Sequence, residues 1–294
     1  MAKSKKVLIL GASGMLGHVL FTELQKDHNV FGTVRSNANL PFKDDRGLIN
    51  DVNIEDLNNL ENIIKILTPD IVINCVGIIK QLQESKNKIV SIEINALFPH
   101  KLSEICEKYK ARVIHFSTDC VFSGEKGNYK ETDLADARDT YGLTKYMGEI
   151  DYPHTLTLRT SIIGHELNSA VSLLDWFLTQ DKACNGFTEA IFSGFPTITV
   201  ARFLNNFVFP NEELSGVYNF SSDPISKYDL LLKIKKQYQK NIQISPSDKL
   251  KIDRSLDSSK LKEKINFKNQ SWDEMIADMH AHFNSSQLYS RRRF

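Results

Sequence analysis

The chain has 294 residues, of which 41% are apolar and 25% are charged, and its formal net charge is +1. This length can bury a substantial core without disulfides or metals, and it fits one large domain or two unequal ones. The balanced charge argues against a nucleic-acid-binding protein and against a protein that binds an anionic membrane surface.

The first predicted elements are a strand, a glycine-rich turn and a helix. Apolar residues 7–10 run into Gly11, Gly14 and Gly17, and an amphipathic stretch at 16–24 follows. Glycine allows the positive φ or close backbone approach that such a turn needs, and the helix N-terminus suits a pyrophosphate. A structural turn of another α/β protein is the alternative. The predicted dinucleotide-binding loop comprises Gly11, Ser13, Gly14, Met15, Leu16 and Gly17.

Strands and helices then alternate up to about residue 163. Strands are expected at 29–34, 47–50, 71–75, 112–116 and 156–158, and helices at 56–67, 89–109 and 143–150. This alternation predicts an α/β fold with a Rossmann-type, doubly wound parallel sheet, in which ligands bind at the carboxyl ends of the strands. We assign residues 1–163 to an NAD(P)-binding domain.

In the second half of the chain the predicted strands and helices no longer alternate regularly. Helices are expected at 170–179, 199–209, 227–238 and 271–283, a strand at 216–220, and mostly loop with a short strand at 183–195. We predict that residues 164–294 form a smaller α/β lobe that binds the substrate. The segments around 195–225 are expected to return to the main sheet.

The end of the second strand bears on the choice of nicotinamide cofactor. NAD sites usually carry an acidic residue here for the ribose 2′-hydroxyl. This chain has Arg35 and Ser36 instead, which suit a 2′-phosphate, so NADPH is the expected cofactor and NADH the alternative. Further cofactor contacts are expected after the third and fourth strands, from Asp51, Val52, Cys75, Val76 and Gly77.

Two short motifs carry the candidate chemistry. Ser117-Thr118-Asp119 follows a predicted strand, and Tyr141 and Lys145 lie four residues apart, on one face of a helix. A tyrosine in an unstructured peptide has a pKa of about 10, and an adjacent ammonium favours the phenolate. With the Thr118 hydroxyl beside the phenol, these groups can protonate a carbonyl oxygen while a hydride reaches its carbon. The alternative is a surface Tyr–Lys pair.

With these motifs the chain resembles extended short-chain dehydrogenases/reductases, and among them the dTDP-4-dehydrorhamnose reductase-like sugar-nucleotide reductases. The matching segments are the glycine loop, 117–124, 127–133 and 141–149, with weaker matches at 194–197, 225–228 and 253–256. The resemblance implies that Thr118, Tyr141 and Lys145 are catalytic and that Tyr141 and Lys145 also contact the cofactor. It further implies reduction of the 4-keto group of a nucleotide-activated 4-keto-6-deoxy sugar, in surface polysaccharide biosynthesis.

Position 120 separates related activities. Dehydratases that resemble this segment carry Asp-Glu after the threonine, as the acid and base of water elimination, whereas this chain has Asp119 and Cys120. A neutral thiol is a poor base, so dehydration is not expected. Enzymes similar to GDP-fucose synthase use a cysteine here as an epimerisation base, which leaves a bifunctional epimerase/reductase open, with His165 as the candidate second proton carrier. A small packing role for Cys120 is the preferred alternative.

In the resembled family the second lobe grips the nucleotide of the substrate. Arg254 lies in a segment that matches the family, and cations suit a diphosphate. The expected substrate-binding residues are Thr118, Asp119, Cys120, Phe187, Thr197, Arg202 and Arg254. The sequence does not distinguish dTDP, UDP and GDP, and a homodimer is a further expectation. Because the family includes a methionine adenosyltransferase partner, a non-catalytic NADP-binding regulatory subunit is an alternative.

The cysteines and the N-terminus bear on location. The four cysteines are scattered without a CxxC pair, so no zinc site is predicted. Apolar neighbours around Cys75 and Cys106 are typical of unreactive thiols in a reducing compartment. The basic start at residues 1–6 is followed by only four apolar residues, too few for a signal peptide or a membrane span. We therefore expect a cytoplasmic protein.

Overall fold

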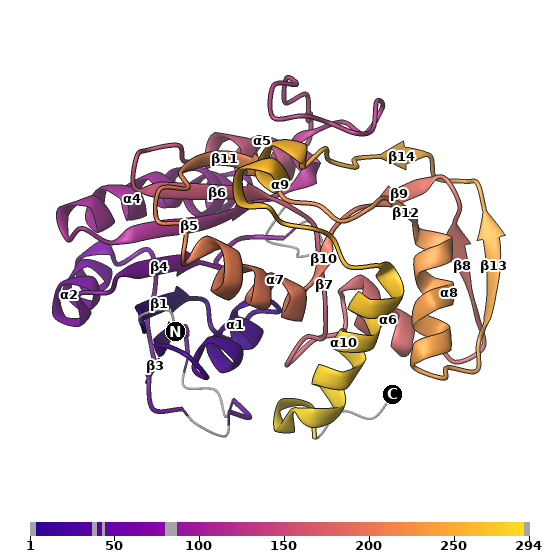
Figure 1. Ribbon diagram of the computed structural model, residues 1–294, viewed down its shortest axis with the longest axis horizontal. Helices are drawn as coiled ribbons and strands as arrows, with labels where there is room; N and C mark the ends of the chain where they lie inside the picture. The colour runs from indigo at the N-terminus through magenta and orange to yellow at the C-terminus, as the bar shows by residue number, and fades with distance from the viewer. Residues whose placement is uncertain (1–3, 37–39, 43–44, 80–86, 291–294) are drawn as a thin grey trace.

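A seven-stranded parallel sheet lies at the centre of the computed structural model, which describes residues 4–36, 40–42, 45–79 and 87–290. Its strand order is β11-β6-β5-β4-β1-β2-β3 (Figure 1). The strands are β1 (Lys6–Leu10), β2 (Asn29–Thr33), β3 (Leu48–Ile49), β4 (Ile71–Asn74), β5 (Arg112–Ser117), β6 (Thr155–Arg159) and β11 (Gly216–Asn219). The predicted Rossmann-type fold is confirmed. The order reverses between β1 and β4, where such sheets bind ligands.

Helices cover both faces of this sheet. On one face α2 (Leu57–Leu67) and α4 (Phe98–Lys108) pack against buried residues of β1, β4 and β5. On the other face α1 (Gly17–Leu24) and α7 (Thr197–Phe203) pack against the alternate residues of the same strands. Because the inner strands are covered on both sides, they are apolar almost throughout, which is the pattern that made them visible in the sequence.

Two predicted helices differ from the structure in ways that matter for the site. The helix expected at 89–109 is interrupted by a π-helical turn, η2 (Ile92–Leu97), between α3 (Lys88–Ser91) and α4. The helix expected from residue 143 begins earlier, as α5 (Thr140–Met147), because the Asp139 side chain accepts a hydrogen bond from Gly142 N and caps it. Tyr141 therefore lies in the first turn of α5.

Short strands form a second group beyond the main sheet (Figure 1). β8 (Ala183–Phe187) pairs with β13 (Gln243–Ser247), and β9 (Ala190–Phe192) lies between β12 (Ile225–Ser226) and β14 (Ile252–Asp253). The segment 183–195 thus holds more strand than predicted. The remaining elements are β7 (Ile162–Ile163), β10 (Phe195–Pro196), η3 (Asp119–Val121), η4 (Leu204–Val208), η5 (Gln287–Tyr289), α6 (Leu173–Leu178), α8 (Lys227–Gln237), α9 (Ser259–Ile265) and α10 (Trp272–Ser285).

The chain returns from this second group to the main sheet. α7 packs on α1, and β11 pairs in parallel with β6. The second half of the chain therefore supplies the edge strand β11 of the central sheet. The domain boundary at 163/164 stays a prediction.

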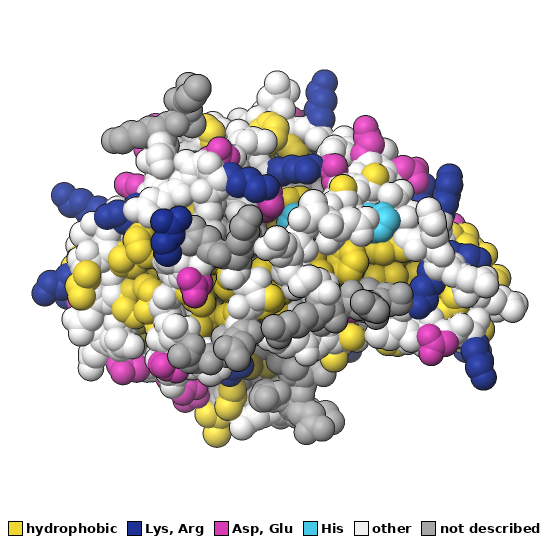
Figure 2. Space-filling model, turned by 90° about the horizontal axis from the view of Figure 1, so that it is seen from below, with side chains coloured by type: hydrophobic (Ala, Val, Ile, Leu, Met, Phe, Trp, Pro, Cys, Tyr) yellow, Lys and Arg dark blue, Asp and Glu magenta, His cyan; other side chains and the backbone are white. Residues whose placement is uncertain are grey.

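The molecular surface mixes both signs of charge. On the face drawn in Figure 2, Lys and Arg side chains are interspersed with Asp and Glu side chains, with apolar side chains between them. Within the described ranges, no helix has the length and apolar character to cross a membrane.

Candidate active site

The carboxyl ends of the central strands bring most of the predicted residues to one edge of the sheet. Leu10 pairs with Thr33 on one side and with Asn74 on the other, and Ser117 pairs with Arg159. The segments that follow these strand ends therefore lie together. They contain the glycine loop, Arg35, Ser36, Asp51, Val52, Cys75, Val76, Gly77, Thr118, Asp119 and Cys120.

The glycine loop has the geometry that a pyrophosphate site requires. Gly11 has a φ of +82°, and Gly14 N donates a 3.1 Å hydrogen bond to Gly11 O. A Cβ on Gly17 would lie 2.1 Å from Gly11 O, so only glycine fits there. Among the described residues, the amides of Met15 and Leu16 have no hydrogen-bond acceptor. These two N–H groups at the start of α1 fit the phosphates of a dinucleotide.

We expect Gly17→Ala to destabilise the fold and weaken dinucleotide binding together. The added Cβ forces the backbone apart at Gly11 O, which should exceed the about 1–3 kcal/mol typical of overpacking and lower the unfolding temperature by about 5 °C or more. Thermal unfolding and NADPH titration measure both effects. Gly14→Ala is the matched control, because its Cβ would contact only Gly11 O, at 3.4 Å. A Gly17→Ala protein that unfolds at the Gly14→Ala temperature would contradict this account.

The residues predicted to choose the cofactor lie beside the ends of β2 and β3. Arg35 and Ser36 are exposed, two and three residues after the end of β2. Val52 is buried, and its N–H donates to Val34 O over 3.0 Å, which holds residues 51–52 against the end of β2. Asp51 is exposed, with a φ of 57°. An exposed guanidinium at this place can reach a phosphate on the adenosine ribose.

Thr118 and Tyr141 meet at the end of β5. The Thr118 hydroxyl donates to Asp119 Oδ1 and accepts from Cys120 N, both over 3.1 Å, which caps η3. Burial raises the pKa of Tyr141, the neighbouring Cys120 thiol raises it further, and the hydrogen bond with Thr118 lowers it. The phenol is therefore a proton-bearing group at neutral pH, as a general acid must be.

Lys145 is buried one helical turn from Tyr141 and points to β5. Its Nζ donates a 2.6 Å hydrogen bond to Phe116 O. Burial lowers the pKa of Lys145 to about 8, and Glu149 opposes that shift. The expected lowering of the Tyr141 pKa by the Lys145 ammonium is not what the structure gives, because burial of the phenol outweighs the other effects and its pKa is raised.

A buried ion pair that the sequence did not reveal supports this edge of the site. Arg159 donates from Nε and from one terminal nitrogen to the two carboxylate oxygens of Glu149, over 2.8 and 2.7 Å. Ser117 Oγ donates to the same carboxylate over 2.7 Å. Both charged side chains are only 6% exposed. The pair, with Ser117, therefore links the carboxyl ends of β5 and β6 to the segment just after α5.

Asn95 is a second residue that the sequence did not reveal. It lies in the π-helical turn η2, where its Oδ1 accepts from Ile78 N over 2.9 Å and its Nδ2 donates to Ile78 O over 3.1 Å. A Cβ on Gly148 would lie 1.9 Å from Asn95 O. The π-helical turn therefore lets the Asn95 side chain hold the segment after β4. The backbone of the same turn packs closely against Gly148, at the end of α5.

Cys120 and Arg254 come together from opposite parts of the chain. Arg254 follows β14, donates from Nε to Phe122 O over 2.7 Å, and has a terminal nitrogen 3.8 Å from Cys120 Sγ. Burial raises the pKa of Cys120 to about 12, Asp119 raises it further, and Arg254 lowers it. The thiol is therefore protonated at neutral pH and is a weak base.

His165 does not reach this constellation. It is 2% exposed, and its Nδ1 lies 2.7 Å from Asp175 Oδ1 and its Nε2 2.9 Å from Tyr238 OH. Its ring also stacks on Phe283. The His165 imidazole is therefore part of a buried hydrogen-bonded network in the second lobe. The epimerase hypothesis loses its candidate second proton carrier.

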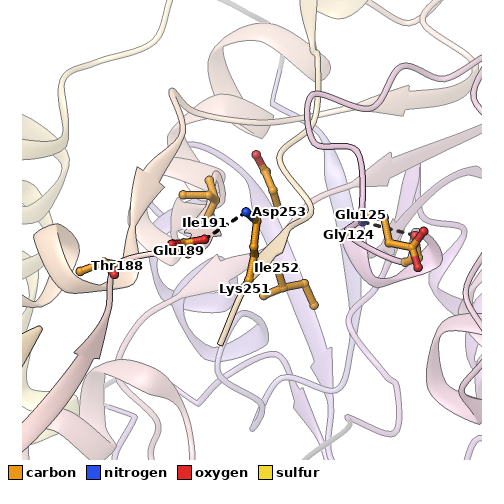
Figure 3. Close-up of a pocket in the computed structure, with 9 residues that line it drawn as sticks. Gly124, Glu125, Thr188, Glu189, Ile191, Lys251, Ile252 and Asp253 are labelled. Atoms are coloured by element: carbon orange, nitrogen blue, oxygen red, sulfur yellow. Dashed lines mark hydrogen bonds and ion pairs between the residues drawn. The ribbon is translucent and has the colours of Figure 1, made fainter. Parts of the chain in front are cut away.

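A cavity of about 610 Å³ lies between the loop after η3 and the second lobe. It is lined by residues 123–125, by 188, 189 and 191, and by 251–253 (Figure 3). Three of the lining residues are acidic, namely Glu125, Glu189 and Asp253, and the Lys251 ammonium lies 3.3 Å from Glu189. Asp253 Oδ1 accepts a 2.9 Å hydrogen bond from Ser255 N. This lining is unfavourable for a diphosphate, whereas Arg254, directly after Asp253, offers a cation nearby.

The other predicted substrate residues lie in three different settings. Phe187 is half-buried at the end of β8, one residue before Thr188 at the cavity. Thr197 is buried at the start of α7, against Gly164. Arg202, five residues further along the helix, forms an ion pair with Asp278 of α10 at 2.5 Å. Five residues turn a helix by about 140°, so Arg202 lies away from the side that Thr197 occupies, and its predicted substrate role has no support here.

Comparison with known proteins gives matches over most of the chain. A family model described as the RmlD substrate binding domain matches residues 5–285. A probable low-salt glycan biosynthesis reductase from Haloferax volcanii is 31% identical over 161 residues, which cover 53% of this chain and 52% of that relative. The chain therefore spans about half the length of this curated relative.

Two further matches have different printed functions. The methionine adenosyltransferase 2 subunit beta of Xenopus laevis is 25% identical over 77% of this chain and 70% of its own. A crystal structure of dTDP-4-dehydrorhamnose reductase from Bacillus anthracis in complex with NADP has a TM-score of 0.79 and 18% identity, covering 95% of this chain and all of that one. At that identity the structural match shows the fold.

Proposed function

Because the chain belongs to the family of the RmlD substrate binding domain, we propose that it is an NADPH-dependent reductase. Its substrate is the 4-keto group of a nucleotide-activated 4-keto-6-deoxy sugar, used in surface polysaccharide biosynthesis. The observation that carries the proposal is the meeting of Thr118, Tyr141 and Lys145 at the strand edge that also holds the glycine loop. NADH is the alternative cofactor.

Each catalytic residue has a separate task in this reaction. Bound NADPH supplies a hydride for the carbonyl carbon. The Tyr141 phenol donates its proton to the carbonyl oxygen, and the Thr118 hydroxyl orients that oxygen beside the phenol. A Lys145 ammonium stabilises the phenolate left behind, since an opposite charge favours the ionised form.

Turnover of a sugar-nucleotide panel tests the proposal. dTDP-, UDP- and GDP-linked 4-keto-6-deoxy sugars are each incubated with the protein and NADPH, and the loss of NADPH absorbance is followed. Reduction of at least one of them is expected. If NADPH binds but none is reduced, the reductase proposal fails.

The regulatory-subunit alternative is favoured by one observation, the similarity to a methionine adenosyltransferase subunit. Such a role does not require an intact set of Thr118, Tyr141 and Lys145. A change in methionine adenosyltransferase activity on mixing, without turnover of any keto sugar, would support it.

For the epimerase/reductase alternative, solvent deuterium at C3 or C5 of the product is the test. A thiol with a pKa of about 12 at Cys120 argues against it.

Removal of the Arg35 guanidinium should change the cofactor preference. An ionic hydrogen bond to a phosphate contributes about 1.5–3 kcal/mol, so Arg35→Ala should weaken NADPH binding about ten- to a hundred-fold. NADH lacks the 2′-phosphate, so its affinity should stay the same and is the internal control. Both dissociation constants can be measured by fluorescence titration. An equal loss for the two cofactors would show that Arg35 holds the loop and not the phosphate.

The nucleotide part of the substrate is assigned to the second lobe. Arg254 would pair with the diphosphate, Phe187 would contact the base, and Thr197 would offer a hydroxyl. The acidic cavity beside Arg254 is better suited to an uncharged part of the substrate than to the diphosphate. Arg202 is left out because it pairs with Asp278.

A homodimer is the proposed assembly. α3 and η2 pack along α5 and leave large apolar side chains exposed, among them Ile89, Ile92, Tyr146 and Met147. Exposed apolar patches of this kind mark interaction surfaces. The mass of the protein in solution, measured by light scattering, tests this assembly.

A further inference from the structure

A chain of buried polar side chains runs from the end of β4 to Lys145. Asn74 Nδ2 and His115 Nδ1 are 3.1 Å apart, and His115 Nε2 lies 3.4 Å from Lys145 Nζ. Asn74 and His115 are each 1% exposed, and Lys145 is 6% exposed. The proposed reaction gives His115 no task, although it contacts a catalytic residue.

The Asn74 amide determines which nitrogen of His115 carries the proton. Val76 N donates to Asn74 Oδ1 over 3.0 Å, so the amide nitrogen is the atom turned toward His115. An amide nitrogen only donates, so His115 Nδ1 is the acceptor and carries no proton. Burial and the Lys145 charge, with a further contribution from His100, lower the pKa of His115 well below its usual value. The neutral ring therefore has its proton on Nε2, facing Lys145 Nζ.

An ammonium group cannot accept the Nε2–H bond, because it has three donors and no lone pair. A neutral amine can accept it while one of its own N–H groups still donates to Phe116 O. We propose that His115 is a positioning residue for Lys145. Asn74 holds the His115 ring with its proton on Nε2, and this ring favours the neutral amine of Lys145 over the ammonium. This inference rests on the proposed function, in which the charge of Lys145 matters to catalysis.

Other charged groups act on the pair from the neighbouring elements. Glu149, just after α5, raises the pKa of Lys145, but its carboxylate is shared with Arg159 and Ser117. His100 of α4 acts on His115. Burial, the largest effect on Lys145, acts in the same direction as His115 and brings the pKa of Lys145 to about 8. A reduction that needs the ammonium should therefore decline as the pH rises through this value.

Nitrogen NMR of protein labelled with ¹⁵N-histidine tests the tautomer without any substrate. A ring nitrogen that carries a proton differs strongly in ¹⁵N shift from one that does not. We expect His115 to have its proton on Nε2 from about pH 6 upward. The His115 ring signal is identified as the one that disappears in the His115→Gln variant. If that variant does not fold, the His115 signal is identified as the one that shifts in Asn74→Asp. A proton on Nδ1 would overturn the proposal, whether or not the protein reduces any sugar.

Asn74→Asp tests the consequence for Lys145. The carboxylate keeps the acceptor for Val76 N–H but replaces the Nδ2 donor, so the His115 proton should move to Nδ1. His115 Nε2 can then accept from the Lys145 ammonium, and the alkaline decline of kcat should move up by about one pH unit or more. The added negative charge also favours the ammonium, so the same substitution is compared in a His115→Phe background. A shift less than half as large there is expected, and equal shifts in both backgrounds would overturn the proposal.

Discussion

Tyr141→Phe should lower kcat for the keto-sugar reduction by about 10²- to 10⁴-fold, the range that a positioned general acid contributes. Phenylalanine keeps the ring of a half-buried side chain but removes the proton that the carbonyl oxygen receives. The raised pKa of Tyr141 means that the phenol holds this proton throughout the neutral range, so the loss should be nearly independent of pH there. Single-turnover measurements with NADPH would isolate the chemical step.

Two measurements show whether this loss is chemical. NADPH affinity should remain close to that of the unchanged protein, because the glycine loop and Arg35 supply most of the proposed contacts. Tyr146→Phe is the matched control, since Tyr146 lies on the same helix with 46% of its surface exposed. It should keep full activity. If Tyr141→Phe still reduced the sugar at a rate close to that of Tyr146→Phe, the catalytic assignment would be wrong.

The elements that the sequence revealed are those whose signal is local. β1, the glycine loop and α1 show continuous apolar residues, glycines and helical periodicity within residues 6–24. The spacing of Tyr141 and Lys145 likewise predicted one helical face without knowledge of the rest of the fold. Local signals also placed the strand ends, and the parallel register then brought their loops to one edge.

What the sequence did not reveal depends on contacts between distant segments. β13 and β14 are short and pair with β8 and β9, some 60 residues earlier, so no periodicity marks them. His115 is one polar residue within an apolar strand, and only the neighbouring strand shows that Asn74 faces it. The lowered pKa of Lys145 follows from burial, which residue spacing does not report. These are the features that set the chemistry of the site rather than its location.

Glu149→Gln should strongly destabilise the fold. It removes the carboxylate charge that compensates the buried Arg159 guanidinium, and breaking one partner of a buried ion pair costs about 3–5 kcal/mol. One Arg159 nitrogen already has no hydrogen-bond partner among the described residues, so the site has little capacity to adapt. Urea unfolding should show a lower midpoint. The Lys145 pKa should also fall below about 8, because Glu149 raises it, and the alkaline decline of kcat should begin at lower pH.

Two further variants separate the buried charge from the loss of a contact. Lys233→Gln removes an exposed ion pair with Asp273 and should change the free energy of unfolding by less than about 1 kcal/mol. The double variant Glu149→Leu/Arg159→Met replaces both charges with apolar side chains and should recover much of the stability that Glu149→Gln loses, since no buried charge remains without a partner. If the double variant were as unstable as Glu149→Gln, the cost would come from the hydrogen bond with Ser117 and from packing. If it recovered stability while the pH dependence of kcat stayed shifted, the carboxylate would have two separable roles: compensation of Arg159 and retention of the charge on Lys145.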